Sequence, residues 1–96
     1  MLPVKENIYV LELPGKGPML ALDTADPDKR RVFVASCRRS IKSLEEEGFH
    51  GFFQIGSHLD VGLAAWEIWG DPPAATIQGL LDRVRRELSE AGYPEV

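Results

Sequence analysis

The fold is decided by a stretch in the second half of the chain, Leu63-Ala64-Ala65-Trp66-Glu67-Ile68-Trp69. Aliphatic and aromatic residues dominate this stretch, as is typical of a β-strand. The segment from Phe49 to Gly56 has the same character, and a turn-like segment, Ser57 to Gly62, joins the two. Two strands this close in the sequence predict an antiparallel hairpin.

Helices are expected on both sides of the hairpin. Asp26-Pro27 and Asp71-Pro72-Pro73 are helix start signals, because Asp can cap a helix and Pro suits its first position. Apolar residues at three- and four-residue steps follow each signal, and Gly48 and Gly92 are natural stops. The sequence therefore predicts one helix over residues 26–47 and another over residues 72–91.

The N-terminal part of the chain adds one expected strand. Residues 5–13 are rich in β-branched and aliphatic residues and are stopped by Pro14-Gly15. The next apolar run, Met19-Leu20-Ala21-Leu22, is too short for a packed helix. We expect it to form a single helical turn or an irregular apolar tether.

The order strand, helix, strand, strand, helix predicts an α+β fold of the ferredoxin-like, split βαββα(β) kind. Its sheet is antiparallel, both helices cover one face, and the C-terminal tail can add a last short strand. With 96 residues the chain is expected to be a single domain, residues 1–96.

Strand alternation divides the side chains of the expected sheet between two faces. The helices need the face with Ile8, Val10, Phe53, Ile55, Ala64, Trp66 and Ile68. The opposite face then carries Tyr9, Leu11, Phe52, Gln54, Leu63, Ala65, Glu67 and Trp69. Such an apolar face predicts an interface, and two-fold symmetry favours a homodimer that packs sheet on sheet.

An aromatic third strand in this order of elements resembles the dimeric α/β-barrel branch of ferredoxin-like folds. The chain also resembles a family of small uncharacterised proteins in that branch. Four pieces carry this second likeness: Met19 to Leu22, Ser40-Ile41 through Leu44 to Gly48, His58, and Trp66-Glu67-Ile68-Trp69 before Pro72. The branch includes muconolactone isomerases, chlorite-dismutase-like haem proteins and antibiotic-biosynthesis-type monooxygenases. The resemblance implies a cavity for a small ligand and no particular reaction.

The residues themselves suggest what such a cavity could hold. We expect a small apolar or aromatic molecule against Tyr9, Phe52, Gln54 and Trp69. Two alternatives stay open: a cofactor-free enzyme of the monooxygenase or isomerase kind, and a structural or regulatory interaction module that binds no ligand.

Two residues are candidates for catalysis in the enzyme alternative. His58 has Asp60 nearby, and a histidine with a carboxylate can transfer protons near neutral pH. It can equally be an ordinary turn residue beside a locally bonded Asp60. Glu67 lies between two tryptophans, where a desolvated carboxylate suits proton transfer. It can instead form an ion pair with an arginine, either Arg38 or one from the other protomer of a dimer.

The composition limits which partners, cofactors and cellular location we expect. The net charge of −4 argues against a nucleic-acid partner, and no apolar run is long enough for a membrane span, so neither partner is expected. One cysteine, Cys37, cannot form an internal disulfide, and we expect a cytoplasmic protein with an inert, buried thiol. Two histidines without further ligands nearby predict no metal site, and no cofactor is expected.

Overall fold

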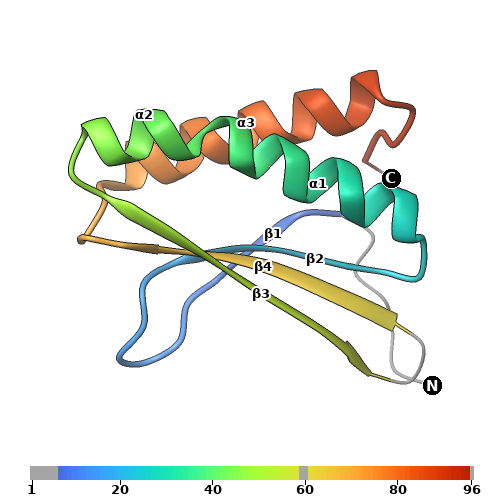
Figure 1. Ribbon diagram of the computed structural model, residues 1–96, viewed down its shortest axis with the longest axis horizontal. Helices are drawn as coiled ribbons and strands as arrows, with labels where there is room; N and C mark the ends of the chain where they lie inside the picture. The colour runs from blue at the N-terminus through green and yellow to red at the C-terminus, as the bar shows by residue number, and fades with distance from the viewer. Residues whose placement is uncertain (1–6, 59–60, 96) are drawn as a thin grey trace.

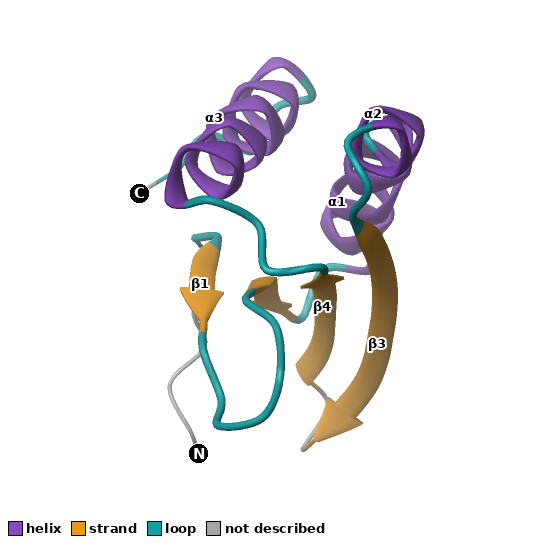
Figure 2. Cartoon of the chain, turned by 90° about the vertical axis from the view of Figure 1, so that its left-hand side faces the viewer, coloured by secondary structure: helices purple, strands orange, loops and turns teal. Residues whose placement is uncertain are grey.

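The computed structural model describes residues 7–58 and 61–95 of the chain. The elements are, in order, β1 (Tyr9–Leu11), β2 (Met19–Thr24), α1 (Pro27–Arg39), α2 (Ile41–Glu46), β3 (His50–His58), β4 (Val61–Trp69) and α3 (Ala74–Glu90) (Figure 1). The strands form one antiparallel sheet in the order β1-β2-β4-β3. The helices form a second layer on one side of it (Figure 2). We call the two sides of the sheet the helix-covered face and the open face.

This architecture confirms the expected α+β class, the antiparallel sheet and the β3–β4 hairpin. In the hairpin, Phe53 lies opposite Trp66 and Phe52 opposite Glu67. The strands on either side of the helical crossover, β2 and β3, are separated by β4. That arrangement is compatible with a ferredoxin-like fold, but the strand beside β2 comes from the N-terminal side of the chain as β1. Residues 91–95 form no strand.

The expectation for Met19 to Leu22 is wrong. These residues belong to β2, an inner strand that pairs with β1 and β4. Met19, Leu20, Ala21 and Leu22 are all at most 2% exposed. A strand buried on both faces has a continuous apolar sequence without alternation, so a short apolar run does not reveal its secondary structure.

The helix boundaries follow local capping chemistry. Asp26 caps α1 as predicted, because its side chain accepts hydrogen bonds from the backbone N–H groups of Asp28 (2.8 Å) and Lys29 (3.4 Å). The expected single helix is broken at Ser40 into α1 and α2. The helix α3 starts at Ala74, later than predicted, and has no side-chain cap. Pro73 disfavours helical geometry for the residue before it, which delays the start.

The helix-covered face contains the main core. Trp66 is fully buried there and stacks on Phe53, with 5.9 Å between the ring centroids. Cys37 lies in the same core, as predicted, and burial together with the charge of Glu87 raises the pKa of its thiol. Among the described residues no helix is long and apolar enough to cross a membrane.

Candidate functional site

The open face has one row of side chains that crosses all four strands. Leu11 lies opposite Met19, Met19 opposite Glu67, and Glu67 opposite Phe52. Because neighbouring strands in register point the same way at paired positions, these four side chains share the open face. The alternation predicted from sequence is therefore confirmed for Phe52 and Glu67, which lie opposite in direction to Phe53 and Trp66.

A groove lies at the end of this row. Its described lining consists of Lys16, Phe52, Glu67 and Trp69, and its volume is about 460 Å³. Phe52 is 53% exposed and Trp69 47% exposed, although both are large and apolar. Their rings meet edge to face at 6.4 Å between centroids. The structure thus brings together three of the residues that the sequence suggested for a site.

Glu67 is the polar component of this groove. It is only 2% exposed, in contrast to its two aromatic neighbours. The alternative ion pair with Arg38 is wrong, because the Arg38 guanidinium lies 5.6 Å from the centre of the Phe53 ring, on the helix-covered face. Glu67 on the open face is on the other side of the sheet.

Tyr9 shares the open face but lies one row away from the groove, in register with Ala21 on β2. Its hydroxyl donates a hydrogen bond to the Asp23 carboxylate at 3.0 Å. Burial, the hydrogen bond and the negative charge of Asp23 together raise the pKa of Tyr9 to about 12. Tyr9 is therefore anchored to β2, and its phenol faces Asp23.

Two predicted site residues have side chains outside the described part of the structure. Gln54 lies opposite Ala65 in the backbone register, in the same row as Tyr9. His58 ends β3 and lies opposite Val61. Their roles stay predictions. Among the described residues no three histidine, cysteine or acidic side chains form a cluster that could hold a metal ion.

Sequence reasoning missed Lys16 as a lining residue of the groove. The β1–β2 connection reaches the end of β4, where the backbone N–H of Ile68 donates to the Pro18 carbonyl at 2.9 Å. A side chain at Gly17 would collide with the Ile68 carbonyl, so glycine permits this approach. The Gly15-Lys16-Gly17 pattern was the available signal, because small residues often mark a close backbone approach.

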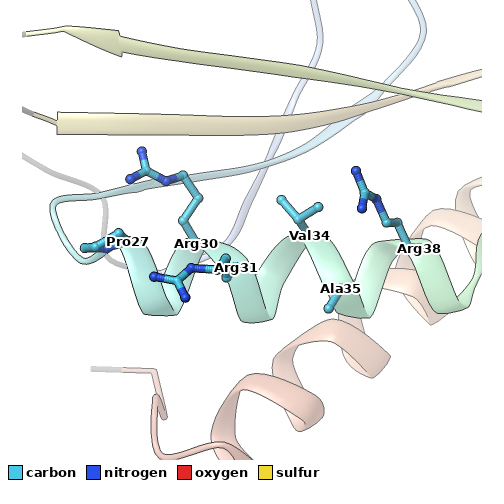
Figure 3. A pocket seen from close by; sticks show the side chains of 6 residues that line it. All are labelled: Pro27, Arg30, Arg31, Val34, Ala35 and Arg38. Atoms are coloured by element: carbon cyan, nitrogen blue, oxygen red, sulfur yellow. The ribbon is translucent and has the colours of Figure 1, made fainter.

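A second groove lies along α1 and is lined by arginines. Its volume is about 540 Å³, and Figure 3 shows the side chains that line it. They are Pro27, Arg30, Arg31, Val34, Ala35 and Arg38. No sequence pattern in this part of the helix predicted a function.

Comparison of the chain with protein-family models, with curated proteins and with solved structures gives no match. Only the geometry of the chain itself therefore bears on its function.

Proposed function

We propose that this protein is a homodimer whose two open faces pack together and enclose a small apolar or aromatic molecule, as in dimeric α/β barrels. The observation that carries the proposal is the exposure of Phe52 and Trp69 side by side on a sheet face that the helices leave uncovered. Full burial of an exposed large apolar side chain is worth about 1.5–3 kcal/mol, and Phe52 and Trp69 are each about half exposed, so burying the rest of both contributes roughly that much together. A second copy of this face provides the simplest way to bury both.

The groove offers a ligand more than apolar area. Phe52 and Trp69 form an aromatic corner, and Glu67 supplies a carboxylate at its base. Ligand sites are commonly apolar with a few placed polar groups that fix orientation. Lys16 adds a positive charge at the same groove. An aromatic molecule with one polar group matches this lining.

Dimerisation is tested by sedimentation of the wild type and of Trp69→Arg at micromolar concentration. The wild type should sediment as a dimer, and the variant as a monomer of 10.7 kDa, because packing the sheets would bury an unpaired charge. Val10→Arg is the matched control, since Val10 is 38% exposed and faces the helix-covered side. A monomeric wild type, or equal effects of both variants, contradicts the proposal.

Ligand binding is tested with Nile red, a neutral dye whose emission rises in apolar surroundings. The dimer should bind it and quench the fluorescence of Trp69. Glu67→Gln conserves volume, so it should keep the fold, and it should bind this neutral dye at least as tightly because the dye offers no donor to the carboxylate. A dimer that binds no dye favours an interaction module instead. The monooxygenase- or isomerase-like alternative would use His58 or Glu67 as its base, and of these two side chains only that of Glu67 is described by the structure.

A further inference from the structure

The described arginines fall into two sets according to their partners. Arg31 pairs with Asp28 at 2.7 Å, and the other paired arginines, on α1 and α3, contact Glu87, Asp82, Glu90 or Glu95. Arg30 and Arg38 have no acidic partner among the described residues. Both line the α1 groove. Two uncompensated positive charges in one groove contrast with the net charge of −4.

The spacing of Arg30 and Arg38 along α1 determines which kind of ligand could contact both. Arg30, Val34 and Arg38 follow at steps of four residues and project to the same side of α1 (Figure 3). Eight residues of α-helix separate the two arginines by about 12 Å. The cation–π contact with Phe53 holds Arg38 at its own end of the groove. A single small anion would not engage both charges, so the complementary ligand carries two acidic groups.

The floor between the two arginines is apolar. Val34 lies midway between Arg30 and Arg38, whereas Pro27 lies before Arg30 and Ala35 projects to the other side of α1 (Figure 3). In an extended polypeptide, residues i and i+4 lie on the same side about 13 Å apart, with residue i+2 between them. An acidic–x–apolar–x–acidic segment would therefore place one carboxylate at each arginine and an apolar side chain on Val34.

We propose that the α1 groove binds an extended acidic segment of another protein, with two carboxylates that flank an apolar residue. Arginine pairs with carboxylates in bidentate geometry, so the interaction is specific in orientation as well as attractive. A nucleic acid fits less well, because binding to it usually depends on many phosphate contacts and the groove provides two uncompensated charges. This groove is separate from the one on the open face, so the two proposals succeed or fail independently.

The test uses fluorescein-labelled peptide GETLTEG and fluorescence polarisation at low salt. The wild type should bind the peptide, and added salt should weaken binding. Arg30→Gln and Arg38→Gln should each lower affinity about three- to tenfold. Arg86→Gln is the matched control: it makes the same charge change on α3, where Arg86 is 68% exposed beside Glu90, and should leave affinity unchanged.

Further measurements distinguish an acidic segment from other possible ligands of the α1 groove. The peptide GQTLTQG should bind much more weakly, and equal binding would overturn the proposal. Tighter binding of an oligothymidylate, or competition by millimolar inorganic phosphate at constant ionic strength, would also overturn it. So would a loss of dimer in Arg30→Gln and Arg38→Gln, because the groove would then be a contact between copies of this chain. Circular dichroism checks that each variant folds.

Discussion

Trp66 and Trp69 lie three residues apart on β4 and have opposite surroundings. Trp66 is fully buried under the helices and stacks on Phe53. Trp69 is 47% exposed and meets Phe52 only edge to face. The two residues point to opposite faces because side chains alternate along a strand. One face of the sheet is completed by this chain's own helices, and the other leaves large apolar groups in contact with water.

The two faces also differ in the polar groups that they bury. On the helix-covered side these include the hydroxyls of Thr24, Ser36 and Ser40, beside the apolar cluster. The open face buries a carboxylate, Glu67, beside the exposed aromatic pair. Removing a carboxylate from water is unfavourable unless other interactions compensate. This contrast between a buried carboxylate and exposed aromatic rings is the reason that the proposed ligand site is placed on the open face.

Truncating the two tryptophans should give the largest contrast between the faces. Trp66→Ala should lower the free energy of unfolding by about 3–5 kcal/mol, because it leaves a cavity in a packed core. Trp69→Ala should lower it by less than about 1 kcal/mol at concentrations where the protein is monomeric. Denaturant unfolding followed by circular dichroism measures both. Equal losses would show that the open face is also packed within a single chain.

Adding a side chain in the core of the helix-covered face should have the next largest effect on the free energy of unfolding. A methyl group at Gly51 would collide with the indole of Trp66, so Gly51→Ala should cost about 1–3 kcal/mol of unfolding free energy. Gly79→Ala is the matched control, because nothing surrounds a side chain at that exposed helical position. Alanine there should stabilise the helix by about 0.5–1 kcal/mol. An unchanged stability of Gly51→Ala would mean that Trp66 has room to move.

The sequence allowed the two faces of β3 and β4 to be predicted because alternation there is clear. Phe53 and Trp66 were expected under the helices, and Phe52 and Trp69 on the open face, as observed. The strand β2 was missed because burial on both sides removes alternation. The break at Ser40 also had no signal, since apolar spacing continues from α1 into α2.

The site could be predicted only where regular structure determined it. Phe52, Glu67 and Trp69 lie on paired strands, so register brings them together. Lys16 lies in a connection, whose path depends on a long-range backbone contact rather than on any periodic pattern. That Arg30 has no acidic partner among the described residues could not be predicted either, because ion pairs depend on which side chains of other elements come near.

Polar side chains also take part in the contact between the helices α1 and α3. Glu87 accepts hydrogen bonds from Ser36 and Arg39 and lies 3.7 Å from Arg83. Burial alone would raise the pKa of Glu87, but the hydrogen bonds and the positive charges of Arg39 and Arg83 outweigh it and hold the pKa below 4.5. Its ionised form therefore stabilises the fold above that pH.

Glu87→Gln should accordingly cost about 1–2 kcal/mol of unfolding free energy at neutral pH. The difference from wild type should shrink as pH falls below about 4.5, because the wild-type carboxylate then becomes protonated. Thermal unfolding of both proteins across this pH range measures the effect. A difference that stays constant with pH would show that the charge of Glu87 contributes nothing.

The smallest expected effect concerns Tyr9, at the far side of the open face. Tyr9→Phe removes the hydrogen bond to Asp23 and should cost about 0.5–1.5 kcal/mol of unfolding free energy at neutral pH. Because folding raises the pKa of Tyr9 from 10 to about 12, its neutral form stabilises the protein fully below pH 10. That contribution should be lost as pH rises from 10 to about 12.

Absorbance of tyrosinate checks this prediction directly. The difference between the titrations of wild type and Tyr9→Phe isolates Tyr9 from Tyr93 and should have its midpoint near pH 12. Asp23→Asn keeps an acceptor and removes the charge, so it should lower that midpoint. A midpoint near 10 in the wild type would mean that Tyr9 is not held by Asp23. Its phenol would then be available to the ligand site, which would extend along the open face as far as β1.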